Sequence, residues 1–440
     1  MTRSTLDIVL QNNTGSANAY AYVTGLDLNR NNAVFLLQAD GVTGYYPSSP
    51  SDILQDVGAD TAIPLGAPGS TKKLTIPQIA GGRIWFSRDG PLKFFLNPGP
   101  AVVEPSATNP ADPNYNLNWG FCEFTFNSFQ VYVNISYVDF VSIPVSLTLE
   151  NDAGTVTNVP GFPSNALDTI CDKLKAQDAA DGAGWSNLVV RTADGSANLR
   201  ALSPNSGIVM NQNLFNGYYQ PYVDAVWDKY RSADLTVNTQ AEWGDVKGRV
   251  GSDNLLTFGS VGSFAQPAAR DIFSCSTGPF GGYPNNQAEM GAIGARIAAA
   301  FNRSTLLIND RQPEGESVAN YYKDVRTNHY SRICHEVSPD GRGYAFPYDD
   351  VSSSNGTDQS GSLFDSNPKL LTVGIGGGNG TTAAAAEGPT EVATKEAVTA
   401  PATTSEKQPQ KEEAQSQKEL RRSNTKSKRQ RLWARVKALV

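Results

Sequence analysis

Two carboxylates, Glu123 and Asp139, lie 16 positions apart in a segment rich in strand-forming residues. Polar and apolar side chains alternate from Phe121 onward, so Glu123, Thr125 and Asn127 share one face of a predicted strand. Hydrolysis of a glycosidic bond needs one carboxylic acid that protonates the leaving oxygen and one carboxylate that activates water or attacks carbon. The pair therefore has the chemistry of a glycosidase site, although isolated acids on strands are more often solvated surface residues.

The residues after Glu123 predict a second strand beside the first. A short connection at 128–130 leads into a strand over 131–136, which sends Tyr132 and Asn134 outward and aliphatic side chains inward. Asp139 then lies on the adjoining stretch, near the first acid. Aromatic rings and amides suit sugar binding, and they are frequent in this segment. They are Trp119, Asn127, Tyr132, Asn134 and Tyr137.

Four segments resemble, in the same order, the glycoside hydrolase family 64 β-1,3-glucanases of the thaumatin-like superfamily. Residues 122–144 are similar to the acidic-cleft hairpin of that group, and 79–88 to its glycine-rich turn and aromatic strand. Residues 271–280 also match, and 343–351 resemble the thaumatin-type tyrosine and aspartate signature. The resemblance covers residues 1 to about 378.

This resemblance implies an inverting endo-hydrolase that releases short laminari-oligosaccharides from β-1,3-glucan, with Glu123 as general acid and Asp139 as general base. An inverting enzyme holds its carboxyls roughly 6.5–9.5 Å apart to admit a water, against about 5 Å in a retaining enzyme. Glu123 must stay protonated to act, which requires burial or a nearby negative charge. An arginine nearby would instead help to keep Asp139 ionised.

The same motif implies the residues that contact the sugars. Thr125, Asn127 and Tyr132 match positions next to the scissile bond. Asn134 stands where plant relatives carry an aspartate, so one cleft charge is missing and a purely electrostatic, noncatalytic cleft is disfavoured.

Three further residues are candidates for the cleft. Arg83 and Arg88 lie on the predicted aromatic strand, and for Arg88 a plain surface position is equally compatible. Asp349 matches the family signature, but its structural alternative is a capped turn that holds the last strands.

The chain as a whole predicts a mainly β fold with an inserted α/β region. It contains 40 glycines and 26 prolines among short runs of strand-forming residues. The resemblance specifies a thaumatin-like β-sandwich or barrel and a smaller mixed α/β domain that flank a wide groove for an extended glucan. Residues 1–160 would carry the acidic cleft, 161–260 the inserted region, and 261–378 the helices and return strands.

Hydrophobic spacing predicts several helices in the second half. Ser164 can cap a helix whose apolar residues recur at helical spacing through Leu174. Further helices are predicted at 221–230, 285–302 and 317–334. Strands are predicted at 187–191, 255–258, 344–346 and 369–373.

Charge divides the chain into an acidic body and a basic end. Residues 418–440 hold nine basic residues and one acid, so the remainder of a chain with net charge −7 stands at −15. An acidic body suits a neutral glucan and disfavours nucleic acid. Residues 379–417 are predicted to be a disordered linker. The basic tail has helical spacing, and anionic lipid, nucleic acid, an acidic partner and plain solvation all remain open for it.

No cofactor or metal is expected. The four cysteines lie far apart without a Cys-x-x-Cys pair, and the only two histidines are spaced for neither a helical metal pair nor a serine triad. Cys122 and Cys171 are predicted to be buried free thiols. If one disulfide forms, Cys275 and Cys334 are the expected partners.

The resemblance implies action on cell-wall glucan outside the cell, whereas the first residues lack the apolar core of a signal peptide. No apolar span is long enough for a transmembrane helix, and a monomer is expected. The alternative to a hydrolase is a noncatalytic thaumatin-like protein that binds β-glucan or the cell wall. A scaffold dominated by the basic tail is a third interpretation.

Overall fold

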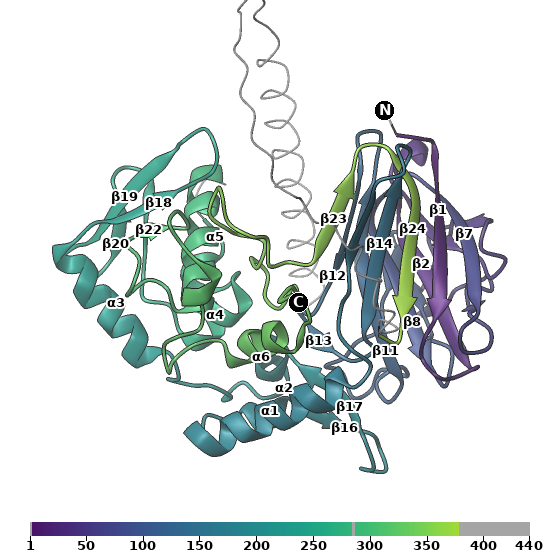
Figure 1. Cartoon of the computed structure of the whole chain (residues 1–440), viewed down its shortest axis with the longest axis horizontal. Coiled ribbons are helices and arrows are strands. Elements are labelled where there is room, and N and C mark those ends of the chain that lie inside the picture. The colour runs from purple at the N-terminus through teal and green to yellow at the C-terminus, as the bar shows by residue number, and fades with distance from the viewer. Residues whose placement is uncertain (1, 284–286, 378–440) are drawn as a thin grey trace, which may run out of the picture. The chain divides into compact units, whose positions relative to one another are not determined.

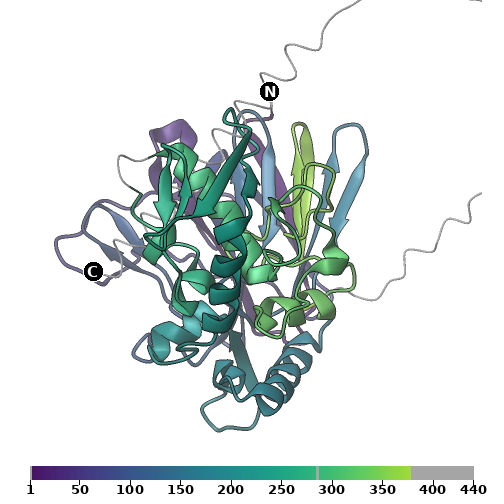
Figure 2. The ribbon, with the colours of Figure 1, turned by 90° about the vertical axis from the view of Figure 1, so that its left-hand side faces the viewer.

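The structure, a computed structural model, describes residues 2–283 and 287–377. The fold is mainly β with a smaller number of helices, as the sequence predicts. Figure 1 shows strands gathered on one side, with most of the helices on the other. Figure 2, turned by 90°, shows the helical part in front of the strands.

One layer of the β part is a five-stranded sheet with the order β15-β14-β24-β1-β7. Its strands are β1 (Thr5–Asn12), β7 (Thr71–Pro77), β14 (Val145–Asn151), β15 (Val156–Val159) and β24 (Pro368–Ile375). The last strand lies parallel to the first, so the C-terminal strand predicted at 369–373 completes this sheet.

The second layer is an eight-stranded sheet with the order β23-β12-β11-β8-β2-β3-β4, in which β6 also pairs with β2. Its strands are β2 (Ala19–Asp27), β3 (Ala33–Leu37), β4 (Gly44–Tyr45), β6 (Ile63–Pro64), β8 (Ile79–Arg88), β11 (Asn118–Phe126), β12 (Val131–Ile135) and β23 (Ser362–Asp365). A small sheet of β5 (Gln55–Asp56), β9 (Phe95–Asn97) and β10 (Ala101–Val103) lies apart from it.

Alternate side chains of the two large sheets enter one hydrophobic core. Ile8 and Val373 come from the first sheet, and Ile84, Phe124 and Val133 come from the second, and all five are buried. Because successive residues of a strand point to opposite faces, the other face of the eight-stranded sheet is available for polar groups.

The α/β part is formed by the chain between β15 and β23. Its helices are α1 (Ala166–Asp181), α2 (Pro204–Met210), α3 (Gln220–Ser232), α4 (Ala269–Ser274), α5 (Ala288–Arg303) and α6 (His329–Val337). Its larger sheet has the order β21-β20-β19-β18-β22. These strands are β18 (Leu235–Asn238), β19 (Asp245–Val250), β20 (Leu256–Phe258), β21 (Gly262–Phe264) and β22 (Arg311–Gln312).

A three-stranded sheet links the loop after β12 to the α/β part. It has the order β13-β17-β16 and consists of β13 (Phe140–Val141), β17 (Asn198–Leu202) and β16 (Val189–Arg191). The loop that contains Asp139 therefore runs directly into a strand that is paired with a strand of the α/β part.

Most of the predicted helices are present. Helix α1 buries Ile170, Cys171 and Leu174 as their spacing requires, although Asn165 rather than Ser164 is the N-cap residue. Helices α3 and α5 cover most of the ranges predicted at 221–230 and 285–302.

Two predicted elements are wrong. The range 317–334 is not one helix, because only a 3₁₀ turn at Val318–Asn320 and the first residues of α6 are helical. Between them Tyr322 has a positive φ of 59° and donates its N–H to the carbonyl of Arg303, so packing against the end of α5 breaks the helix. The expected strand at 344–346 is irregular, since Ala345 donates its N–H to the carboxylate of Asp349.

All four cysteines are buried free thiols, which confirms the prediction for Cys122 and Cys171. The expected bridge between Cys275 and Cys334 is not formed. Cys275 instead lies 3.2 Å from the carbonyl of Ile272, to which its thiol donates. Burial raises the pKa of both the Cys122 and Cys171 thiols to about 12, so they stay protonated and unreactive at neutral pH.

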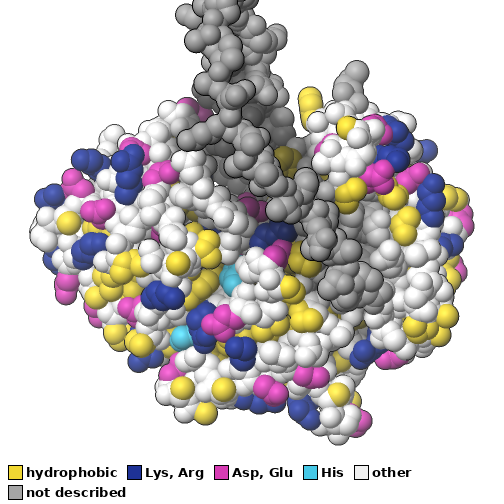
Figure 3. Space-filling view, in the orientation of Figure 1, with side chains coloured by type: hydrophobic (Ala, Val, Ile, Leu, Met, Phe, Trp, Pro, Cys, Tyr) yellow, Lys and Arg dark blue, Asp and Glu magenta, His cyan; other side chains and the backbone are white. Residues whose placement is uncertain are grey.

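The predictions for 379–440 lie outside the described residues. Among residues 2–283 and 287–377, no helix has the length and apolarity needed to cross a membrane. The same residues contain no group of His, Cys, Asp and Glu side chains able to hold a metal ion. On the face drawn in Figure 3, acidic and basic side chains are interspersed over the described surface.

Candidate active site

Strand register places Glu123 at the centre of a polar sheet face. Strand β11 pairs with β8 on one side and β12 on the other, so Glu123 lies opposite both Arg83 and Asn134. Two positions along, Thr125 lies opposite Tyr132. Directly opposed residues in antiparallel strands project from the same face. The predicted alternation is therefore confirmed for Glu123 and Thr125, whereas Asn127 lies beyond the end of the strand.

Arg83 joins two carboxylates on this face. Its Nε and Nη2 atoms each lie 3.3 Å from Oε1 of Glu123, and its Nη1 binds the carboxylate of Glu104. The guanidinium also lies over the rings of Phe121 and Trp85, with 4.8 and 5.2 Å to the ring centroids. These contacts hold the Arg83 guanidinium in a fixed orientation.

The charges around Arg83 are unbalanced toward the negative. Burial disfavours the charged guanidinium, but the carboxylates of Glu104, Glu123 and Asp139 outweigh it and raise the pKa of Arg83. Asp139 therefore lies within electrostatic range of the same guanidinium as Glu123. Together these four residues, Arg83, Glu104, Glu123 and Asp139, are called the Arg83 cluster below.

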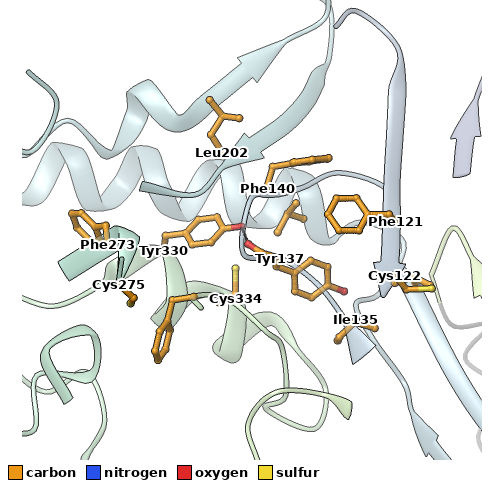
Figure 4. Packing of buried hydrophobic residues seen from close by; sticks show 14 of the residues in the cluster. Phe121, Cys122, Ile135, Tyr137, Phe140, Leu202, Phe273, Cys275, Tyr330 and Cys334 are labelled. Atoms are coloured by element: carbon orange, nitrogen blue, oxygen red, sulfur yellow. Dashed lines mark hydrogen bonds between the residues drawn. The ribbon is translucent and has the colours of Figure 1, made fainter. Parts of the chain in front are cut away.

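Asp139 is held by an anchored loop between β12 and β13. Its carbonyl accepts a hydrogen bond of 2.9 Å from the N–H of Ser203, at the start of α2. Two residues earlier, the Tyr137 ring stacks on Phe162 with 4.2 Å between centroids, and its carbonyl accepts a 2.7 Å bond from the Tyr330 hydroxyl. Figure 4 shows Tyr330 reaching toward the chain at Tyr137.

The residue after Asp139 is the first of β13, and it packs on the side of strand β11. Phe140 packs edge-on against Trp119 with 4.8 Å between ring centroids, and close to Phe121 as well. Figure 4 shows Phe140 and Phe121 close together above Tyr137. Aromatic packing thus fixes the chain on both sides of Asp139, and it ties this acid to the strand that carries Glu123.

The other residues of the motif lie in three different settings. Thr125 and Tyr132 are partly buried on the face of Glu123. Asn134 is buried, and its Nδ2 donates 2.9 Å to the carbonyl of Ile135. Asn127 lies beyond the end of β11, where its Oδ1 accepts the N–H groups of residues 129 and 130 and so forms the hairpin turn.

Two candidates lie away from the cluster. Arg88 ends β8 five positions after Arg83, so strand alternation sends it to the opposite face, where it pairs with Asp89 at 3.1 Å. Asp349 is fully buried and paired with Arg303 and His335. Its position favours the structural role that the sequence left open.

No sequence pattern pointed to Glu104. It follows β10 in an irregular segment without alternation, and only the fold brings it to Arg83. Thr24 is a second such case, since it lies opposite Arg83 on β2 and accepts a 2.9 Å hydrogen bond from the Trp85 indole. Both residues complete the surroundings of Arg83 from distant parts of the chain.

The profile of the glycoside hydrolase family 64 β-1,3-glucanases matches residues 4–375. The chain belongs to this family. The resemblance found in the motifs is therefore confirmed over most of the sequence.

Two relatives of this family 64 chain are glucan endo-1,3-β-glucosidases. The protein of Cellulosimicrobium cellulans is 28% identical over 356 residues, which are 80% of this chain and 62% of that protein. The protein of Arthrobacter sp. (strain YCWD3) is 28% identical over 391 residues, which are 88% of this chain and 67% of that protein. The chain thus spans about two thirds of the length of these relatives.

Solved structures of the family share the fold. A laminaripentaose-producing β-1,3-glucanase, crystallised with laminaritetraose, has a TM-score of 0.74 at 29% identity over 85% of this chain and 99% of that one. A β-1,3-glucanase domain from Clostridium beijerinckii has a TM-score of 0.64 at 20% identity, over 84% and 98% of the two chains. The mainly β family 64 fold therefore extends over almost the whole described chain.

Proposed function

We propose that the protein is an endo-acting hydrolase of laminarin-type β-1,3-glucan, in which Glu123 is the general acid and Asp139 the general base of an inverting reaction. The observation that carries this proposal is the Arg83 cluster, in which Glu123 binds the guanidinium and Asp139 lies within electrostatic range of it. The family and its endo-1,3-β-glucosidase relatives support the choice of substrate.

The reaction assigns one proton transfer to each acid. Asp139 takes a proton from water as the water oxygen attacks the anomeric carbon of a glucosyl residue. Glu123 gives its proton to the departing glycosidic oxygen as the bond to that carbon breaks. Attack from the face opposite the leaving group converts the β linkage into a product of α configuration.

Arg83 is compatible with Glu123 as the general acid only because further carboxylates surround the guanidinium. A lone guanidinium at 3.3 Å would favour the ionised form of Glu123, which cannot act as an acid. Glu104 also binds Arg83, and Asp139 adds a second negative charge nearby. These negative charges oppose the ionisation of Glu123 and favour its protonated form.

Substrate contacts follow from the sheet face. Thr125 and Tyr132 project beside Glu123 and would contact the sugars next to the scissile bond. Asn127 would contact the sugars through its Nδ2, because its Oδ1 is bound in the turn. Asn134 would use its Oδ1, because its Nδ2 donates to the carbonyl of Ile135. We extend the proposal to a thaumatin-like β body, a glucan groove beside the α/β part, and short laminari-oligosaccharides as products.

Chromatography of the products formed from laminarin tests this proposal. Wild-type protein should release short oligosaccharides, and Glu123→Gln and Asp139→Asn should each lower the rate by about 10²–10⁴ because each removes a proton-transfer group. Glu150→Gln and Asp172→Asn are matched controls, since both acids form ion pairs elsewhere and should leave the rate unchanged.

The opposite result has a definite meaning. Laminarin that stays intact but co-sediments with the wild-type protein would make this a glucan-binding protein without hydrolase activity. Loss of activity in the control variants as well would show that general surface charge, rather than the Arg83 cluster, controls the reaction.

A further inference from the structure

An exposed aromatic ring lies on the same sheet face as the Arg83 cluster. Phe364 is in β23, the edge strand of the eight-stranded sheet, and 67% of its surface is exposed. The preceding residue, Leu363, is buried, so Phe364 points away from the core. Figure 1 shows β23 at the side of the β part that is nearest to the α/β part.

Register connects Phe364 with the residues around Glu123. Phe364 lies opposite Tyr132 on β12, and Tyr132 lies opposite Thr125 on β11. The three side chains therefore form one row across three strands. The neighbouring row contains Ser362, Asn134 and Glu123.

The spacing of this sheet sets the distance between ring and acid. Adjacent strands lie about 4.8 Å apart and residues two apart along a strand about 6.8 Å, so Phe364 lies about 12 Å from Glu123. That distance is a few sugar units along an extended glucan whose scissile bond lies at Glu123.

We propose that Phe364, with Tyr132 beside it, is a stacking platform for a glucosyl residue of a long β-1,3-glucan, a few units from the bond that is cut. The inference rests on the proposed function. A β-glucosyl ring has C–H groups on both of its faces, and an aromatic face is an apolar surface on which they can pack. An exposed aromatic ring in a row with Thr125 and Tyr132 has the composition that such a ligand requires.

The test measures binding without catalysis. Laminari-oligosaccharides of increasing length are titrated calorimetrically into Glu123→Gln protein, with and without Phe364→Ala. We expect Phe364→Ala to weaken binding of the longer oligosaccharides by about tenfold, because the apolar area buried on one ring face is lost. The shortest oligosaccharides, which do not reach the platform, should bind equally well to both proteins.

The chain provides a matched control. Phe129 is also 67% exposed, but it lies in the turn between β11 and β12 and not in the row. Phe129→Ala should leave the affinity for every length unchanged, and Phe364→Trp should keep it. Far-ultraviolet dichroism and melting temperature establish that each variant folds.

Two outcomes of the affinity measurements would overturn the platform. In the first, Phe364→Ala leaves the affinity for oligosaccharides of every length unchanged. In the second, Phe129→Ala weakens the binding of long oligosaccharides as much as Phe364→Ala does. Dimers that disappear with Phe364→Ala while glucan affinity stays constant would also overturn it, and would assign the ring to contact between copies. Wild-type protein that binds but does not cleave would end the proposed hydrolysis, while the length comparison would still decide the role of Phe364.

Discussion

Two arginines in this molecule each gather acidic partners, and their surroundings differ. Arg83 binds Glu104 and Glu123 on a partly exposed sheet face, where the side chains of Arg83, Glu123 and Glu104 are 15%, 17% and 39% exposed. Arg303 binds Asp349 at 3.1 Å in the interior, where the two side chains are 1% and 0% exposed. The Arg83 pairs therefore have partial access to solvent, whereas the Arg303 pair has none.

The interior site also makes several hydrogen bonds to the backbone. Arg303 donates 2.9 Å to the carbonyl of Asp349 and also donates to that of Val351. The second carboxylate oxygen of Asp349 lies 2.9 Å from His335 Nε2, and His335 Nδ1 contacts the carbonyl of Gly341 at 2.9 Å. These bonds tie α5 and α6 to the segment that leads into β23.

The difference shows what exposure does to a charged cluster. Buried charges that are paired and hydrogen-bonded hold neighbouring segments in place, but they cannot meet a polymer. Charges on an open face contribute little to stability and can meet a substrate. Position, rather than residue type, separates the candidate active site from the structural one.

The largest expected effect comes from removing each arginine in turn. Arg303→Met should lower the free energy of unfolding by about 3–5 kcal/mol, because it leaves the buried carboxylate of Asp349 without its arginine partner. Arg83→Met should lower it by less, about 1–2 kcal/mol, because the side chains of Arg83, Glu123 and Glu104 keep 15%, 17% and 39% of their exposure to solvent. It should nevertheless reduce laminarin hydrolysis. Urea denaturation and a rate assay on both variants measure these differences. Equal destabilisation by Arg303→Met and Arg83→Met would contradict the distinction between the structural site and the candidate active site.

A smaller effect is expected from Glu104→Gln. The variant removes a negative charge from the Arg83 cluster, so Arg83 favours the ionised form of Glu123 more strongly. Since a general acid works only when protonated, the alkaline limb of the pH profile of kcat/KM should move to lower pH. The shift should shrink at high salt, because Glu104 is partly exposed.

The control for this profile is Glu150→Gln, whose acid pairs with Lys369 on the other sheet. Its profile should coincide with that of the wild type. An alkaline limb that stays in place in Glu104→Gln would contradict a role for Glu104 in keeping Glu123 protonated.

The two histidines should give effects that depend on pH and have opposite signs. Burial and Arg332 lower the pKa of His329 to about 4, so below pH 6.5 the unfolded chain binds a proton that the folded chain refuses. Stability should therefore fall as the pH falls from about 6.5 to 4. His329→Gln should remove this loss.

His335 behaves in the reverse way. Burial opposes its charge, but Asp349 outweighs burial and raises the pKa of His335. Its contribution to stability is present below about pH 6.5 and is lost as the pH rises through the higher folded value. Urea denaturation of His335→Gln and His329→Gln across this range measures both differences from wild type. Slopes of the same sign would contradict the assignment.

Sequence patterns predicted what local alternation determines. The faces of β11 and β12 follow from period-two spacing, which predicts Glu123 and Thr125 on one face of the first strand and Tyr132 outward on the second. The helix α1 followed in the same way from its apolar repeat. Each of these elements carries its own pattern within a few residues.

Patterns failed where distant segments decide the outcome. Glu104 reaches Arg83 only through the fold, and the bend at Tyr322 arises from packing against α5. Cys275 and Cys334 were the expected bridge, but both are free thiols buried in the hydrophobic core. Residue spacing contains no information on such contacts.

The anomeric configuration of fresh product tests the central claim most directly. Proton NMR can follow wild-type protein and Asp139→Asn during cleavage of a laminari-oligosaccharide, before mutarotation mixes the anomers. We expect the α anomer to appear first with the wild type, and no product at a comparable rate with the variant. A β anomer that appears first, or unchanged cleavage by Asp139→Asn, would contradict an inverting reaction in which Asp139 activates water.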